Sequence, residues 1–354
     1  MSQPGTHTRA RREPLSSARP TVAEAYAHCE RITRAHYENF PVASRLLPKA
    51  LRPHVCAVYA FARAADDFSD EAAHEGERLD RLNEWEALLS ACLKDETAHP
   101  VFVALGDTIR RCDLPVQPLR DLLTAFRMDV TTRRHPTFDD LLHYCRYSAN
   151  PVGRVVLGLF GLRDPDLAAW SDRICTALQL TNFWQDIAID LRKERIYLPQ
   201  ADMEQFGVSE EDLFLGHTTP AFVRLLRFEV ARTRDLFHQG LPLVSEMLSQ
   251  TAGHSERPEG AKNLSADKPR FFVASLLRMT QSQGNTNPHS PLTAHQKVYR
   301  RLSYELRLTW LGGMRILDRI EAGGCDVFNR RPTLTARDKI ALLYRAWRFK
   351  DRRS

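Results

Sequence analysis

The sequence lacks the features that mark disulfide-bonded, membrane-spanning or nucleotide-binding proteins. Its seven cysteines are scattered, with no CxxC pair and no Cys/His cluster at zinc spacing, so we expect reduced thiols in a cytoplasmic protein. No apolar run approaches the roughly 18–20 residues that span a bilayer. The absence of a GxGxxG motif excludes a Rossmann cofactor site, and the absence of HExxH gives a zinc hydrolase little support.

The charge pattern gives no support for nucleic acid binding. The formal net charge is +6, but the basic residues are dispersed or lie near the ends, and no nucleic-acid-binding motif accompanies them. We therefore expect no nucleic acid partner and favour an anionic substrate or an anionic membrane surface. The basic N-terminus carries no apolar segment of a secretory signal, so we expect a disordered tail there.

Helical periodicity dominates the chain. Apolar residues recur at helical spacing over residues 21–248 and 298–320, whereas alternating strand patterns are nearly absent. Thr21 and Glu24 resemble a capping box that opens the first helix, and Pro53 suits the first turn of a later one. The sequence therefore predicts an all-α protein. Particular helices are expected at 79–93, 116–130, 138–145 and 152–162.

One stretch interrupts the helical pattern. Residues 250–296 are rich in Ser, Thr, Asn, Pro, Gly and His, and a loop of this length within a compact domain is either functional or disordered. We expect one helical domain over residues 21–347, interrupted by a disordered insertion at 250–296. Residues 1–20 and 348–354 are expected to be basic tails.

Two acidic patches carry the clearest chemistry. The first acidic patch is residues 66–71 (DDFSDE), and the second is residues 182–190 (NFWQDIAID). Side chains four residues apart share a helix face, so Asp66 should project with Asp70, and Asp67 with Glu71. Carboxylates crowded in this way repel one another and favour a bound cation. Two patches facing across a helical cavity would hold Mg²⁺, with phosphate oxygens and water completing its coordination.

The second patch extends the same chemistry along one side of a helix. Gln179, Asn182, Asp186 and Asp190 fall on one face, and the asparagine offers a hard cation a neutral oxygen ligand. A surface stripe with basic neighbours is the alternative for this patch alone, but the presence of two patches disfavours it. The predicted metal ligands are Asp66, Asp67, Asp70, Asn182, Asp186 and Asp190.

Tyr59 and Arg63 precede the first patch on the same helix face. The alternative interpretation is a solvated face with an Arg–Asp pair contributing well under about 1 kcal/mol. The flanking residues are apolar or small, however, so the helix should be buried and its charged stripe should face a cavity or a partner. Metal and diphosphate binding is therefore favoured.

Three further segments have two interpretations each. Residues 148–153 combine small residues with helix breakers, which fits equally a kinked, closely packed helix junction and room for a long apolar ligand. Gly312 and Gly313 indicate helix packing or a helix end. Residues 342–353 are basic and include Tyr344 and Trp347, which is typical of a final helix with a solvated tail; contact with anionic lipid is the alternative.

Together these motifs resemble the squalene/phytoene synthase family. The shared pattern is Tyr59-x3-Arg63-x2-Asp66-Asp67-x2-Asp70, then Gln179-x2-Asn182-x3-Asp186-x3-Asp190, then Arg195-x-Tyr197-Leu198-Pro199. The resemblance covers roughly residues 21–347 apart from the insertion. Residues 38–44, 148–153, 182–186 and 310–314 are most similar to the hydroxysqualene synthase branch of bacterial hopanoid and squalene pathways.

The resemblance implies an isoprenoid synthase fold with both patches facing a central cavity. It further implies a transferase or lyase that converts presqualene diphosphate to hydroxysqualene, with several Mg²⁺ ions and without NADPH. Phe183, Trp184 and Tyr144 would offer aromatic faces to the carbocation, although core packing is their ordinary role. The implied catalytic residues are Asp66, Asp70, Asp186, Asp190, Tyr59 and Arg63, and the implied substrate-binding residues are Tyr59, Arg63, His36, Phe40, Tyr144, Gln179 and Gln185.

Departures from the family pattern affect the choice of reaction. Gln185 stands where condensing relatives have an arginine, and residues 37–39 read Tyr-Glu-Asn where those relatives have Ser-x-Ser. The lost cation favours a reaction with one diphosphate. Glu194 stands where glycine is usual, and Cys325 where tyrosine is usual, without changing the assignment.

Two other functions compete with this one. The closer rival is a condensing synthase of the same family that makes presqualene diphosphate, dehydrosqualene or phytoene. The other is a non-catalytic, synthase-like assembly protein, which the intact aspartates disfavour. Because so apolar a substrate is nearly insoluble, peripheral membrane contact and hand-over from a partner synthase both remain open.

Overall fold

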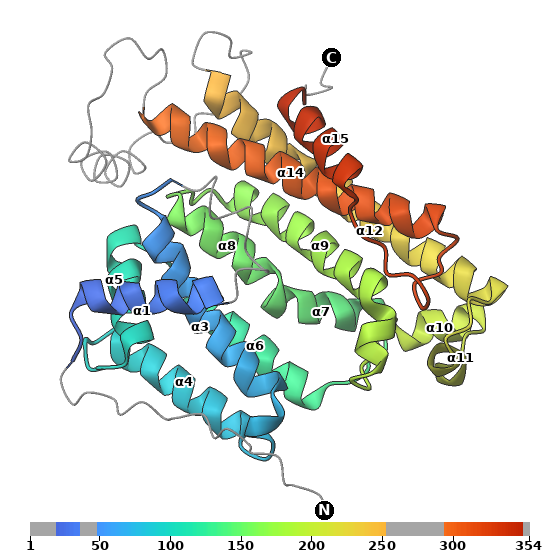
Figure 1. The fold of residues 1–354 in the computed structure, drawn as a ribbon, viewed down its shortest axis with the longest axis horizontal. Coiled ribbons are helices and arrows are strands. Elements are labelled where there is room, and N and C mark those ends of the chain that lie inside the picture. Colours follow the sequence, from blue (N-terminus) through green and yellow to red (C-terminus); the bar gives the residue numbers. More distant parts are fainter. Residues whose placement is uncertain (1–18, 36–47, 253–293, 350–354) are drawn as a thin grey trace, which may run out of the picture.

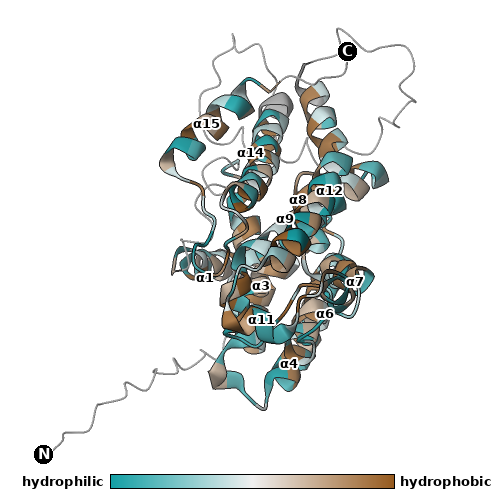
Figure 2. Ribbon diagram, turned by 90° about the vertical axis from the view of Figure 1, so that its right-hand side faces the viewer, coloured by the Kyte–Doolittle hydropathy of each residue, from teal (hydrophilic) through white to brown (hydrophobic). Residues whose placement is uncertain are grey.

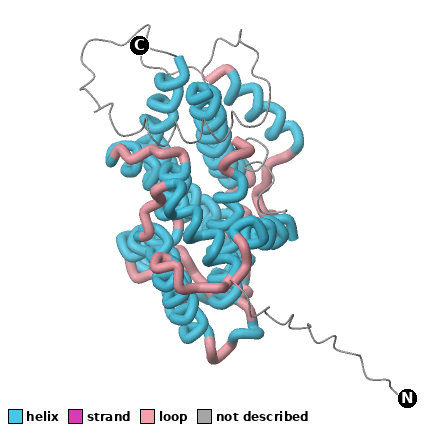
Figure 3. The backbone as a smooth tube through the Cα atoms, turned by 90° about the vertical axis from the view of Figure 1, so that its left-hand side faces the viewer, coloured by secondary structure: helices cyan, strands magenta, loops and turns pink. Residues whose placement is uncertain are grey.

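The protein is built from helices. A computed structural model describes residues 19–35, 48–252 and 294–349, and this part of the chain contains no strand (Figures 1 and 3). The predicted all-α fold is confirmed. The helices are α1 (Val22–Ala35), α3 (Arg52–Asp70), α4 (Arg78–Cys92), α5 (Pro100–Cys112), α6 (Gln117–Thr131), α7 (Phe138–Ser148), α8 (Asn150–Leu159), α9 (Pro165–Leu191), α10 (Gln200–Phe206), α11 (Glu210–Leu215), α12 (Pro220–Ala252), α14 (Ala294–Ala322) and α15 (Ala336–Trp347), with a 3-10 turn at Ala72–His74.

Local sequence determines where several helices begin. Thr21 and Glu24 form the predicted capping box: the Thr21 hydroxyl donates to Glu24 Oε2 at 2.7 Å, and the Glu24 N–H donates back to Thr21 Oγ1 at 3.3 Å. Pro53 lies in the first turn of α3, as expected. Residues 1–18 of the predicted tail (1–20) and residues 253–293 of the predicted insertion (250–296) lie outside the described residues. Helices α12 and α14 extend a few residues into the predicted insertion.

Two hydrophobic cores divide the bundle. The first is formed mainly by α1, α3, α4, α5 and α6, around the fully buried Phe61 and Phe102. The second is formed mainly by α7 to α15 around α9, whose buried Trp184 donates from Nε1 to Thr233 Oγ1 of α12 at 2.8 Å. In Figure 1 the first group is the blue and cyan part, and the second runs from green to red. α3 belongs to the first core and α9 to the second, and an ion pair joins Asp70 at the end of α3 to Arg195 just after α9, so the two acidic patches lie where the cores meet.

The junction between α7 and α8 is closely packed. A Cβ on Gly153 would lie 2.3 Å from the Ser171 hydroxyl oxygen of α9, so α8 and α9 approach each other too closely there for a larger residue. The buried Asn150 accepts a hydrogen bond from the Thr176 hydroxyl at 2.9 Å. These contacts confirm the packing interpretation of residues 148–153, and room for a ligand stays a prediction.

Candidate active site

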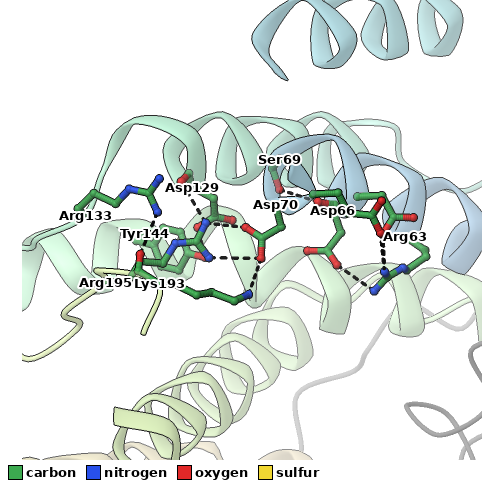
Figure 4. A network of polar contacts seen from close by, with 11 residues as sticks. Arg63, Asp66, Ser69, Asp70, Asp129, Arg133, Tyr144, Lys193 and Arg195 are labelled. Atoms are coloured by element: carbon green, nitrogen blue, oxygen red, sulfur yellow. Dashed lines mark hydrogen bonds and ion pairs between the residues drawn. The ribbon is translucent and has the colours of Figure 1, made fainter. Parts of the chain in front are cut away.

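The first acidic patch lies at the C-terminal end of α3. Arg63, one to two turns earlier, pairs with Asp66 at 3.3 Å and with Asp67, and lies 3.8 Å from Glu71 (Figure 4). Burial raises the pKa of Asp66, and the neighbouring charge of Asp70 raises it further. The predicted pairing of side chains is therefore present: Asp66 and Asp70 act on each other, and Asp67 and Glu71 both lie beside Arg63.

Asp70 is held by the turn that follows α9. Arg195 donates from Nη2 to Asp70 Oδ1 at 2.6 Å, and the Lys193 ammonium lies 2.8 Å from Asp70 Oδ2 (Figure 4). Burial alone would raise the pKa of Asp70, but the hydrogen bonds from these two cations bring it below its ordinary value. Residues 192–195, which we call the basic turn, thus connect the second core to the first patch.

Two residues that depart from the expected pattern have left-handed backbone. Glu194 of the basic turn has a φ of +58°, and Cys325 has a φ of +63°. This left-handed conformation costs a residue with a Cβ roughly 1 kcal/mol. At Glu194 it is held by the Arg134 guanidinium, which donates to the Glu194 carbonyl at 2.5 Å.

The second acidic patch lies on the C-terminal half of α9. Arg331, from the segment between α14 and α15, donates to both carboxylate oxygens of Asp186 at 2.5 and 3.0 Å. Burial and the charge of Asp186 raise the pKa of Asp190 to about 7, with a smaller contribution from Asp70. Asn182 is exposed beside them. Since the charge of Asp70 acts on Asp190, the two patches are electrostatic neighbours.

Asp129 of α6 is a site residue that the sequence analysis missed. The Tyr144 hydroxyl donates to Asp129 Oδ1 at 2.8 Å, and Arg195 Nη2 donates to the Asp129 carbonyl at 3.3 Å (Figure 4). Burial raises the pKa of Asp129 to about 6, although the Tyr144 hydrogen bond opposes the increase. A single aspartate in an amphipathic helix has no distinguishing pattern, so only the fold reveals its position.

Aromatic rings lie beside this carboxylate. Phe183 of α9 stacks on Tyr197 with ring centroids 3.7 Å apart, and Tyr144 lies 6.0 Å from each of them. The structure therefore brings together two of the three predicted aromatic residues, Phe183 and Tyr144. The third, Trp184, is fully buried in the second core, which is the packing role considered as the alternative.

The remaining predicted site residues have varied positions. Gln185 is buried and donates from its amide to the Pro332 carbonyl, away from the stripe formed by Asn182, Asp186 and Asp190. Tyr59 and Gln179 are half-buried on α3 and α9. His36 and Phe40 lie outside the described residues. Substrate contacts by these residues stay predictions.

The donor set has the chemistry that Mg²⁺ prefers. Asp66, Asp70, Asn182, Asp186 and Asp190 offer oxygen ligands only, and a cation would relieve the repulsion that raises the pKa of Asp190. In the part of the chain that the structure describes, no three acidic, histidine or cysteine side chains converge as metal ligands. Asp70 is instead paired with Lys193 and Arg195, and Asp186 is paired with Arg331.

The fold and the two neighbouring acidic patches define a helical isoprenoid synthase. The family model for squalene/phytoene synthase matches residues 33–255, and the chain belongs to this family. The family consists of enzymes that act on prenyl diphosphates and join them head to head.

The relatives include enzymes with different products. The chain is 39% identical to a hydroxysqualene synthase of Rhodopseudomonas palustris, over 61% of this chain and 73% of that protein. It is 32% identical to a phytoene synthase of Arthrospira platensis, over 64% of this chain and 77% of the relative. A solved squalene synthase, HpnC of Alicyclobacillus acidocaldarius, is 36% identical with a TM-score of 0.68, covering 86% of this chain and 95% of that one. A dehydrosqualene synthase, 23% identical with a TM-score of 0.69 over 93% of this chain and 97% of that one, shares the fold.

Proposed function

We propose that this enzyme converts presqualene diphosphate to hydroxysqualene in a Mg²⁺-dependent reaction without NADPH. The carbon–oxygen bond to the diphosphate breaks, and its electron pair leaves with the diphosphate. The resulting carbocation rearranges, and water captures it as an alcohol with loss of one proton. A condensing reaction that makes presqualene diphosphate, dehydrosqualene or phytoene is the second candidate, supported by the phytoene synthase relatives.

The choice between these two reactions rests on the positive charge available at the second acidic patch. Gln185 is neutral, and its amide is committed to the Pro332 carbonyl. The neighbouring Arg331 supplies a guanidinium to Asp186. Gln185 therefore adds no positive charge to this patch, which suits the release of a single diphosphate, whereas joining two prenyl diphosphates requires two to be bound together.

The first patch supplies groups for binding the leaving diphosphate. The Arg63 side chain is 25% exposed beside the patch, so its guanidinium can donate to an anionic oxygen. Oxygen ligands for Mg²⁺ would come from both patches, and the bound metal would stabilise negative charge on the departing diphosphate. The predicted ligands are Asp66, Asp67, Asp70, Asn182, Asp186 and Asp190.

The aromatic cluster suits the cationic stage of the reaction. The faces of Phe183, Tyr197 and Tyr144 present negative electrostatic potential. When ionised, the Asp129 carboxylate that accepts the Tyr144 hydrogen bond adds to this negative potential. These groups are fixed by burial before the reaction begins, so they stabilise positive charge without reorganising.

A product assay tests the proposal. Presqualene diphosphate with Mg²⁺ and without NADPH should give hydroxysqualene and free diphosphate, whereas farnesyl diphosphate alone should give no product. A product from farnesyl diphosphate alone would move the enzyme to the condensing class. Asp186→Asn should abolish the reaction, and substitution of the exposed Asp80 of α4 by Asn should leave it unchanged.

A further inference from the structure

Helix α15 presents large apolar side chains to solvent. Ile340 and Trp347 are each 69% exposed, Tyr344 is 54% exposed and Leu343 is 49% exposed. Their spacing of three or four residues places them on one side of the helix, which we call the outer face of α15. Figure 2 shows α15 at the periphery of the molecule with hydrophobic residues along it. An exposed apolar face of this kind marks an interaction site.

The opposite side of α15 fixes the helix on α14. Leu342 and Ala346 are buried there, and the Arg307 guanidinium of α14 donates to the Ala346 carbonyl at 2.7 Å. Asp338 caps the start of α15 and is held by Arg315 and Arg319 of α14 at 2.8 and 2.5 Å. These contacts fix α15 on α14 with its outer face directed toward solvent.

The exposed charge on α15 is entirely basic. Asp338 is the only carboxylate of the helix, and it is buried against the arginines of α14. On the helix surface, Lys339 borders one side of the outer face, and Arg337 and Arg348 border the other. The Arg348 guanidinium also donates to the Tyr344 hydroxyl at 2.7 Å, at the edge of the apolar stripe.

We propose that the outer face of α15 docks the protein on an anionic lipid bilayer. An apolar stripe with aromatic residues between rows of basic residues is the pattern of helices that lie in a membrane interface. The apolar side chains would enter the headgroup region while the arginines and lysine contact lipid phosphates. No helix within the described ranges is long and apolar enough to cross a bilayer, so α15 is a surface contact. This surface is independent of the proposed reaction.

The charge around α15 distinguishes a bilayer from other occupants. Another exposed apolar pair, Phe214 and Leu215 on α11, lies beside Glu210 and Glu211, which an anionic surface would repel. A second copy of the chain would bring the basic rows of two α15 helices together, and like charges across an interface oppose association.

Vesicle binding of the full chain tests the proposal. The protein should float with phosphatidylcholine vesicles containing phosphatidylglycerol, and much less with pure phosphatidylcholine, and high salt should weaken the binding. Ile340→Ser/Trp347→Ser should reduce binding about tenfold or more, as should Arg337→Glu/Lys339→Glu. The control Phe214→Ser/Leu215→Ser removes two other exposed apolar side chains, 53% and 58% exposed, and should bind as the wild type does.

Fluorescence gives a second readout. Trp347 is the one strongly exposed tryptophan, because Trp85, Trp184 and Trp310 are buried and Trp170 is half-buried. Brominated lipids should therefore quench the wild type and not Trp347→Phe. Absence of binding to anionic vesicles, or equal binding by the α15 variants, would overturn the proposal. So would a dimer in analytical ultracentrifugation that Ile340→Ser/Trp347→Ser dissociates, since the face would then belong to a second copy.

Discussion

Arg195 and Asp70 form a 2.6 Å ion pair although they are separated by 125 residues in the sequence. The pair links the basic turn after α9 to the end of α3, and therefore links the two hydrophobic cores. Arg195 is 8% exposed and also donates to the Asp129 carbonyl. One guanidinium thus positions the first acidic patch relative to Asp129.

Arg195→Ala should weaken both folding and activity. The free energy of unfolding should fall by about 2 kcal/mol, because Asp70 and the Asp129 carbonyl lose a largely buried partner. Catalytic rate should fall about tenfold or more, because Asp70 loses its position. Urea denaturation and a diphosphate-release assay would measure the two effects.

Acid should reduce the stability effect of Arg195→Ala. The pKa of Asp70 is lowered in the folded protein, so the pair stabilises the fold above the ordinary carboxyl pKa and is lost as pH falls through the lowered value. The exposed Arg192 of the same turn supplies the control, since Arg192→Ala should change neither quantity. Equal effects of the two substitutions would show that Arg195 has no special role.

We expect Asp190 to lower the free energy of unfolding of the metal-free protein and to contribute to metal binding. Its pKa is raised to about 7, so the folded protein retains a proton that the unfolded chain has already lost. The free energy of unfolding therefore falls as the pH rises from about 4 to about 7. Asp190→Asn should therefore increase the free energy of unfolding by about 1–2 kcal/mol at pH 8 without metal. The same change should weaken Mg²⁺ binding, measured by calorimetry.

Proton release provides an independent check on Asp190. Below pH 7 the carboxyl must lose its proton before it can bind a cation, so Mg²⁺ affinity should rise with pH up to about 7–8 and then level off. Calorimetry in buffers of different ionisation enthalpy should detect the released proton in the wild type and not in Asp190→Asn. The exposed Asp235 of α12 is the control, and Asp235→Asn should behave as the wild type does. A pH-independent Mg²⁺ affinity would contradict the prediction.

Much of the fold and part of the site follow from residues close together in the sequence. The capping box at Thr21 and the face shared by Asp66 and Asp70 depend on spacing along one helix, so periodicity predicts them. The pairs Arg195–Asp70 and Arg331–Asp186 join residues far apart in the chain, and no local pattern encodes them. Asp129 was missed for the same reason.

Tyr144 and Asp129 should depend on each other during catalysis. Tyr144→Phe removes the hydrogen bond that lowers the pKa of Asp129, so this pKa should rise above about 6. If ionised Asp129 stabilises the carbocation, activity should fall on the acid side of about pH 6 in the wild type. Tyr144→Phe should shift this limb to higher pH, and Asp129→Asn should remove it. The pH dependence of single-turnover rates would measure this.

A double-mutant cycle would separate this coupling from a purely structural role. The combined variant should lose less activity than the sum of the two single changes, because each acts through the same hydrogen bond. Tyr304→Phe is the control, because the Tyr304 hydroxyl donates to the Leu343 carbonyl of α15 and not to Asp129. Unchanged pH profiles in all variants would assign Tyr144 and Asp129 to packing alone.

Two adjacent glycines of α14 should respond oppositely to the same substitution. A Cβ on Gly313 would lie 2.3 Å from the Phe237 ring and 3.1 Å from Leu178, whereas a Cβ on Gly312 would meet nothing within 4 Å. Gly313→Ala should therefore lower the free energy of unfolding by about 1–3 kcal/mol through overpacking. Gly312→Ala should raise it by about 0.5–1 kcal/mol, because alanine is the better helix former. The two positions are adjacent on one helix, so each variant is the control for the other. If the denaturant midpoints of both variants moved in the same direction, the packing of α14 against α9 and α12 would be contradicted.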